Sequence, residues 1–154
     1  MSDAGPYKYA TRIVRVFPDY AESVIWFSDP FPYEESRLTT DLVDGLRSWD
    51  ARYYSELTDD FRWRSLDTLH TFNRDGLELA RRVAAEIGSS FEVEYRSFED
   101  GAVALLRSDE PATNPDAEAA FQKRAQGAEE EWVAIRARAA AYPSSRAGHW
   151  GLAP

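Results

Sequence analysis

The sequence predicts an α+β protein with a small, mostly antiparallel, four-stranded sheet covered by two helices, plus a long C-terminal helix. Segments in which polar and apolar residues alternate indicate half-buried strands, and apolar residues at helical spacing indicate amphipathic helices. The 154 residues suit a single domain. We expect its core at about 11–107, the last helix at 115–141 and a tail at 143–154.

Four short segments are predicted strands: 11–17, 23–27, 90–98 and 102–107. The third alternates most strictly, which places Phe91, Val93 and Tyr95 on the inner face. Asp100 and Gly101 favour a type I′ turn, so the last two strands should form a hairpin.

Three segments are predicted helices: 41–57, 66–87 and 115–141. Their starts carry N-cap residues, namely Thr39 or Thr40, Ser65 and Asn114, and Gly88 closes the second helix. Gly76 lies on the apolar stripe of that second helix. This position indicates close packing against another element.

The last helix carries a narrow apolar seam of heptad type, made of Phe121, Ala125, Ala128, Trp132, Ile135, Ala139 and Tyr142. This seam either docks on the sheet or forms a homodimer. The two prolines within 28–36 predict a loop there. The segment 143–154 shows no periodic pattern of apolar residues and is expected to be a tail or a segment that docks through Trp150.

Composition excludes several classes of function. The formal net charge of -9 and the pI of about 4.7 disfavour nucleic acid as a ligand, because phosphate binding uses clustered lysine and arginine. Without cysteine and with 2 histidines, the chain is expected to hold no metal or cofactor. No apolar run exceeds five residues and no secretion signal is visible. The expectation is a cytoplasmic protein that does not enter a membrane.

Catalytic motifs are also missing, since the sequence has no Gly-x-Ser-x-Gly, no glycine-rich phosphate loop and no His-Glu-x-x-His. The leading hypothesis is therefore a non-catalytic protein-binding module. A more specific version is an immunity-type inhibitor whose anionic surface caps a basic toxin. The alternatives are a small enzyme or ligand binder with a pocket between sheet and helices, and a structural subunit that assembles through the last helix.

Aromatic and acidic residues are mixed in one predicted loop, and such surfaces suit protein partners because rings supply desolvation energy and acids steer a cationic partner. The predicted partner-binding residues are Asp29, Phe31, Tyr33, Glu34, Glu35 and Tyr54. The competing interpretation is that Phe31 and Tyr33 pin this loop to the core.

A ligand site is the other possibility, and it would use His70, Arg62, Trp63 and Arg64. The cationic and aromatic side chains suit stacking on a base or binding of an anion, and His70 suits a general base. The competing interpretation is a network of ion pairs with the nearby aspartates.

Three stretches together carry a resemblance: Leu42-Val-x-x-Leu46-Arg-x-Trp49-x-x-x-Tyr53, Phe72-Asn-x-x-Gly76-x-x-Leu79-Ala80, and Gly88 leading into Phe91-Glu-Val-Glu-Tyr95. They resemble a loose group of small acidic actinobacterial proteins, and the 16 Arg against 2 Lys fit a high-GC source. The resemblance covers about 11–97 and implies a β-α-α-β arrangement. No activity and no site are attached to the group.

Overall fold

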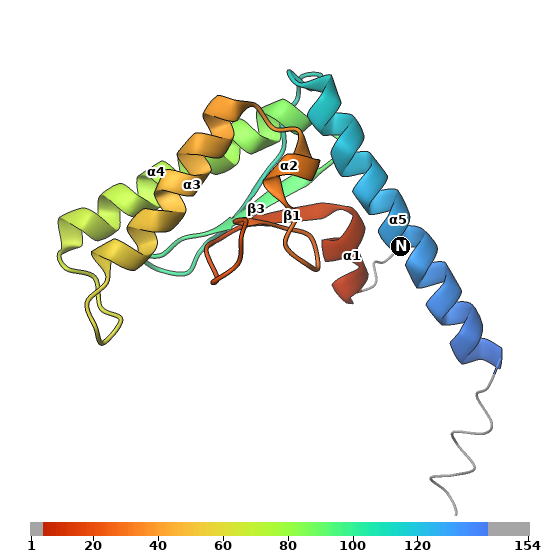
Figure 1. Cartoon of the computed structure of the whole chain (residues 1–154), viewed down its shortest axis with the longest axis horizontal. Coiled ribbons are helices and arrows are strands. Elements are labelled where there is room, and N and C mark those ends of the chain that lie inside the picture. The colour runs from red at the N-terminus through yellow and green to blue at the C-terminus, as the bar shows by residue number, and fades with distance from the viewer. Residues whose placement is uncertain (1–4, 142–154) are drawn as a thin grey trace, which may run out of the picture.

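The computed structural model describes residues 5–141, so Tyr142, the tail at 143–154 and its Trp150 lie outside the described residues. Within this range the chain forms α1 (Gly5–Thr11), β1 (Ile13–Val16), β2 (Ile25–Trp26), α2 (Tyr33–Ser36), α3 (Thr40–Glu56), α4 (Leu66–Ile87), β3 (Glu92–Arg96), β4 (Val103–Leu106) and α5 (Pro115–Ala141). The α+β class, the four strands and the long last helix agree with the prediction (Figure 1).

The strand order is β2-β1-β3-β4, and the two outer pairs are antiparallel. The central pair is parallel, with Val14 opposite Val93. The sheet is therefore mixed, which the sequence did not predict. The chain leaves β1 through β2 and returns to β3 only after α3 and α4, so this long crossover brings β3 beside β1 in the same direction.

One face of the sheet is buried under α3 and α4, and the inward residues include Val14, Val93 and Tyr95 (Figure 1). The register places Arg15 and Glu94 on the opposite face. There α1 covers part of the sheet, because the Tyr9 hydroxyl donates to Glu94 at 3.3 Å and the Arg15 guanidinium lies 4.7 Å from the centre of the Tyr9 ring. The strand alternation predicted for 90–98 is confirmed.

Helix starts agree closely with the predicted caps. Thr39 accepts from the Leu42 amide, and Ser65 forms a capping box with Thr68. Two short helices were not predicted, α1 and α2. The single turn α2 interrupts the segment predicted as loop, because the Ser36 hydroxyl donates to the Tyr33 carbonyl and closes the turn locally.

The hairpin between β3 and β4 is confirmed, but its turn is longer than the two-residue type I′ turn predicted. Residues 97–102 connect the strands, because Arg96 pairs with Val103. The side-chain oxygen of Asn73 accepts from the Phe98 amide at 2.9 Å, and the Phe98 ring packs edge-on against Phe72 at 5.2 Å. Burial of this ring draws the turn toward α4.

Gly76 lies where the sequence placed a close approach. A Cβ atom at this position would overlap the Trp49 ring and the Tyr95 hydroxyl. The Trp49 ring stacks on Phe72 at 4.6 Å between centroids, and its indole nitrogen donates to the Phe72 carbonyl. The missing side chain thus lets α3 and α4 share one aromatic core above the sheet.

A buried carboxylate joins three distant segments. Glu86, at the end of α4, is 8% exposed. It accepts from the Thr39 amide at 2.9 Å, from the Thr39 hydroxyl at 2.5 Å and from the Asn114 side-chain amide at 2.9 Å. Thr39 and Asn114 are the N-caps of α3 and α5. One carboxylate therefore fixes where both helices begin.

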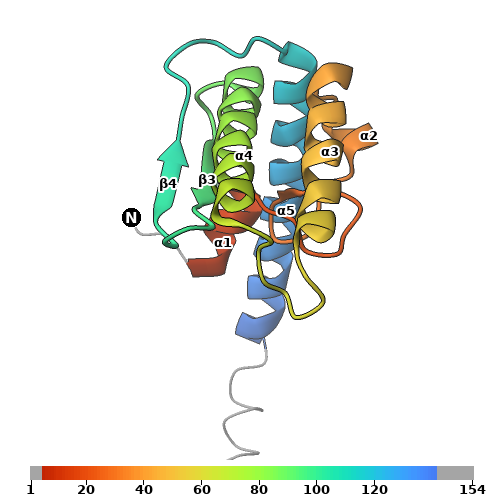
Figure 2. The ribbon, with the colours of Figure 1, turned by 90° about the vertical axis from the view of Figure 1, so that its left-hand side faces the viewer.

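The packing of α5 against the domain is tightest at its N-terminal end, and α1 contacts the helix further along (Figure 1). Ala117 and Phe121 are fully buried, whereas Ile135 is 44% exposed. The seam was predicted to dock on the sheet or to form a homodimer, whereas in the structure α5 contacts mainly the helices α1, α4 and α2. Both views show the remaining turns of α5 running past the sheet (Figure 1, Figure 2). The homodimer suggested for this helix stays a prediction.

We predict that Glu86→Gln lowers the free energy of unfolding by about 2 kcal/mol, because one side-chain oxygen becomes an NH2 group that faces hydrogen-bond donors. Urea denaturation followed by circular dichroism measures this change. Glu78→Gln is the matched control, because Glu78 lies on α4 with its side chain 65% exposed. Equal stabilities of the two variants would contradict the role assigned to Glu86.

Candidate functional site

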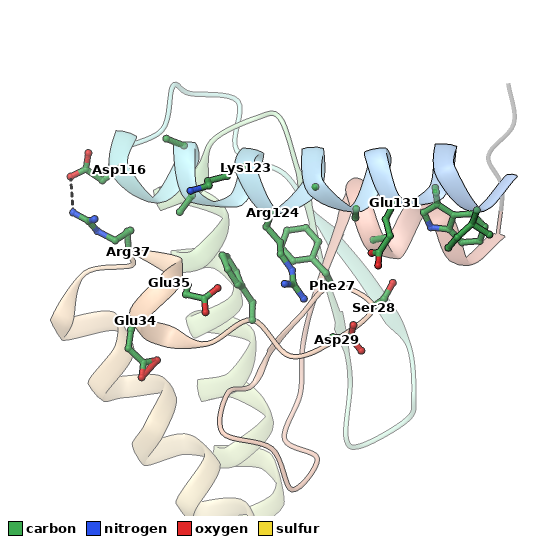
Figure 3. A pocket seen from close by; sticks show the side chains of 18 residues that line it. Phe27, Ser28, Asp29, Glu34, Glu35, Arg37, Asp116, Lys123, Arg124 and Glu131 are labelled. Atoms are coloured by element: carbon green, nitrogen blue, oxygen red, sulfur yellow. Dashed lines mark ion pairs between the residues drawn. The ribbon is translucent and has the colours of Figure 1, made fainter. Parts of the chain in front are cut away.

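A groove of about 1020 Å³ runs between α5 and the segment that links β2 to α3. Phe27, Ser28 and Asp29 follow β2 on one wall, and Glu34 and Glu35 of α2 continue it. The opposite wall is the face of α5 from Asp116 to Ile135 (Figure 3). At 1.5 Å of helix rise per residue this wall is about 28 Å long, which suits a polypeptide segment better than a small molecule.

The base of the groove is an aromatic cluster that fastens α5 to the domain. Phe121 of α5 lies edge-on to Phe31 with ring centroids 4.9 Å apart, and it lies 5.7 Å from Phe27 and 6.0 Å from Phe91. All four rings are at most 3% exposed. Edge-to-face packing of this kind resists sliding of the helix. The wall formed by α5 is therefore held rigidly near its N-terminal end.

Small residues on α5 leave the space open. Ala119, Ala120, Gly127 and Ala128 all line the groove. A Cβ atom on Gly127 would meet nothing within 4 Å. Larger side chains at these positions would fill the space beside the aromatic base.

Charge is distributed unevenly along the groove. Glu34 and Glu35 lie at one end, and Asp29 and Glu131 approach each other from opposite walls at the other (Figure 3). Within residues 5–141, these four carboxylates form no ion pair. Unpaired carboxylates around an apolar base are a surface that attracts a cationic partner.

Basic side chains interrupt this acidic rim. Lys123 and Arg124 of α5 face the groove between the two acidic ends, and the Arg124 guanidinium lies 5.7 Å from the centre of the Phe31 ring (Figure 3). Arg37 is paired with Asp116 at 3.8 Å. The groove thus alternates negative, positive and negative charge along its length, which gives it a preferred register for a charged partner.

Four of the six residues predicted to bind a partner line this groove: Asp29, Phe31, Glu34 and Glu35. The three carboxylates are accessible to solvent, whereas the Phe31 side chain is buried and belongs to the aromatic cluster at the base of the groove. Tyr33 is 6% exposed and does not line the groove. Its hydroxyl accepts from the Val24 amide at 3.1 Å, and burial raises the pKa of this hydroxyl above its ordinary value of 10.0. Tyr54 lies away from the groove on α3, where its hydroxyl accepts from the Tyr20 amide at 2.7 Å.

The residues predicted for a ligand site do not line the groove. Trp63 is half-buried against Phe72, with ring centroids 5.0 Å apart. Arg62 pairs with Asp60 at 3.7 Å, and Arg64 donates to the Ser55 carbonyl at 3.2 Å. The structure thus gives each of these three side chains a local partner.

His70 is engaged as well. Its Nδ1 atom is within ion-pair distance of Glu99, on the turn between β3 and β4. Within the part of the chain that the structure describes, no group of three or more His, Asp or Glu side chains could hold a metal ion. No helix there is long and apolar enough to cross a membrane.

The sequence indicated the α5 wall only in part, since Ala128, Trp132 and Ile135 of the predicted seam line the groove. The charged residues of this wall, Lys123, Arg124 and Glu131, lie off that seam and were not predicted. Alanine and glycine at 119, 120, 127 and 128 were the available signal, because such small residues mark a helix face that leaves room beside it.

Comparison with known protein families shows which family the chain belongs to. Residues 12–98 match the family described as Serratia CdiI immunity protein-like. The match spans more than half of the chain, so the chain belongs to this family. No curated protein and no solved structure matches it. The match includes the β2–α2 wall of the groove and stops before α5, which supplies the other wall.

We predict that Tyr33→Phe flattens the loss of stability at alkaline pH. Burial raises the pKa of Tyr33, so the folded chain keeps the proton while the unfolded chain ionises above about pH 10. The folded form then binds more protons, and stability falls as pH rises. Urea denaturation between about pH 8 and 11 measures the slope. An unchanged slope in Tyr33→Phe would mean that the hydroxyl is not buried.

Proposed function

We propose that this chain is an immunity protein that binds a protein toxin and neutralises it in the cytoplasm, with the groove between α2 and α5 as the binding site. Membership of the CdiI immunity protein-like family supports an immunity role. The observation that carries the site is the groove itself, with four unpaired carboxylates around an aromatic base. Such a surface suits a polypeptide segment with cationic side chains.

Association with a basic toxin follows from the charge of the whole chain. The net charge of -9 attracts a cationic protein over distances of about 10 Å at moderate salt. Once contact is made, Asp29 with Glu131 and Glu34 with Glu35 provide two acidic ends that fix the register. The basic side chains between them disfavour a segment that is cationic throughout. Neutralisation then results from occlusion of the toxin, without any chemical step.

The wall supplied by α5 lies outside the family match, so this helix supplies the contacts particular to the chain. Lys123, Arg124 and Glu131 are its charged groove residues. Under this proposal they decide which toxin is bound, and the wall between β2 and α3 provides the shared part of the contact.

We predict that the double variant Glu34→Gln and Glu35→Gln weakens toxin binding about tenfold at low salt and less at high salt, because both the steering field and the contact lose charge. The partner is captured from host lysate on the tagged chain, identified, purified and titrated by calorimetry at low and high salt. Glu129→Gln with Glu130→Gln is the matched control, since these carboxylates have the same charge and do not line the groove.

A variant that fills the groove without changing its charge tests the contribution of shape to toxin binding. Gly127→Trp places a large ring on the open wall and should abolish binding while the fold is retained, because the position has free space around it. Cells that produce the toxin should survive with the wild-type chain and not with this variant. The proposal would be contradicted if the affinity of the chain for the toxin did not change with salt, in the double variant or in the blocking variant.

A further inference from the structure

A second surface of the molecule lies away from the groove, where the connection between β1 and β2 meets α3. At its tip Tyr20 is 75% exposed, among the most exposed of the large apolar side chains. The Tyr20 amide donates to the Tyr54 hydroxyl at 2.7 Å, and the two rings lie 4.9 Å apart at an angle of 46°. The exposed ring is therefore held in place by α3.

The backbone at Tyr20 is in the left-handed region, with φ 53°. Glycine or asparagine normally occupies such a position, because a large side chain there is strained. Packing in the core does not explain the choice of tyrosine, since three-quarters of the residue is in solvent. The arrangement presents an aromatic face outward at a cost to the local backbone.

A carboxylate without a partner lies beside this pair of rings. Asp50 and Tyr54 are one turn apart on α3, so their side chains share a face of the helix. Asp50 is half-buried, and burial raises the pKa of its carboxyl group. Its charge also raises the pKa of Tyr54, although burial of Tyr54 contributes more. Within residues 5–141, Asp50 forms no ion pair or hydrogen bond.

The neighbouring charges do not neutralise Asp50. Arg47 lies one turn earlier on α3, and its guanidinium lies 5.0 Å from the centre of the Tyr33 ring. Asp19, next to Tyr20, adds negative charge. The pKa of Tyr53 is raised mainly by burial, with smaller contributions from Tyr20 and Asp19. The surface thus combines the exposed Tyr20 ring and the half-buried Tyr54 ring with carboxylates that lack a cation.

We propose that Tyr20, Tyr54 and Asp50 form a docking site for one arginine side chain of a protein partner. A planar guanidinium can stack on a tyrosine ring while its N–H groups reach a carboxylate, whereas the lysine ammonium offers neither the flat face nor the fork of donors. Pairing would also give Asp50 the counter-ion that it lacks inside the chain.

Identifying that partner with the toxin rests on the proposed function. The three residues do not line the groove, so this site adds a second contact to the same complex. Two separated contacts fix the orientation of a partner more firmly than one, and tyrosine with arginine is a pairing enriched at the centres of protein interfaces.

The site is tested with two short peptides, N-acetyl-Gly-Arg-Gly-amide and N-acetyl-Gly-Lys-Gly-amide, each titrated into the 15N-labelled full chain. The Tyr20 amide signal reports binding, since this amide donates to Tyr54. We expect the arginine peptide to bind about threefold more tightly than the lysine peptide. Asp50→Asn and Tyr20→Gly should each remove that preference. Asp44→Asn should keep it, because Asp44 is an exposed aspartate on the same helix and away from the three residues.

Equal responses to the two peptides, or the same behaviour of Asp50→Asn and Asp44→Asn, would overturn the site. With the purified toxin, Asp50→Asn should weaken binding about tenfold relative to Asp44→Asn. Unchanged affinity would overturn the assignment of the arginine to the toxin. Failure of the wild-type chain to bind any toxin, with the arginine preference intact, would overturn the proposed function and leave the arginine site standing.

Discussion

The position of the last helix depends on the carboxylate of Glu86. A charge this deeply buried is tolerated only when hydrogen bonds satisfy it, and here the donors come from the caps of α3 and α5. The Asn114 side-chain amide also donates to the Arg37 carbonyl at 2.9 Å, which ties the exit of α2 to the same point. The two walls of the groove thus meet at one joint. The rest of α5 is positioned by that joint, by the ring cluster beside it and by α1.

Few residues of this long helix are fully buried. The buried residues of α5 are Ala117 and Phe121, and the helix then runs on with polar and charged side chains on most of its surface. A helix of this kind gains little from further docking on its own domain. Its exposed turns are available to a partner, with Glu131 set across from Asp29. The attachment of α5 at its N-terminal end therefore determines both the position of this helix and the shape of the proposed binding groove.

Much of the fold was predictable because local signals were strong. N-caps and apolar stripes located α3, α4 and α5 within a residue or two, and strict alternation located β3. The parallel pairing of β1 with β3 was not predictable, since it depends on how the crossover through α3 and α4 folds back on the sheet. The long turn before β4 was missed because the burial of Phe98 and its bond to Asn73 are tertiary effects.

Part of the candidate site was predictable from local sequence signals. The acids at 29, 34 and 35 stood out in a short aromatic stretch, and they line the groove. The rings beside them, Phe31 and Tyr33, are buried. The Phe31 amide donates to the Ile25 carbonyl of β2, and Tyr33 begins the short α2 turn. The seam predicted on α5 supplies Ala128, Trp132 and Ile135 of the second wall, but its position opposite α2 depends on tertiary packing and required the structure.

Hydrogen exchange of the full chain with and without its protein partner tests the groove most directly. The exposed turns of α5 should exchange quickly when free, because few buried contacts protect them. We expect partner binding to slow exchange at 33–36 and at 119–135, the two walls of the groove. Unchanged exchange on both walls, with protection confined to β4 or to the connection between α3 and α4, would contradict the groove as the binding site.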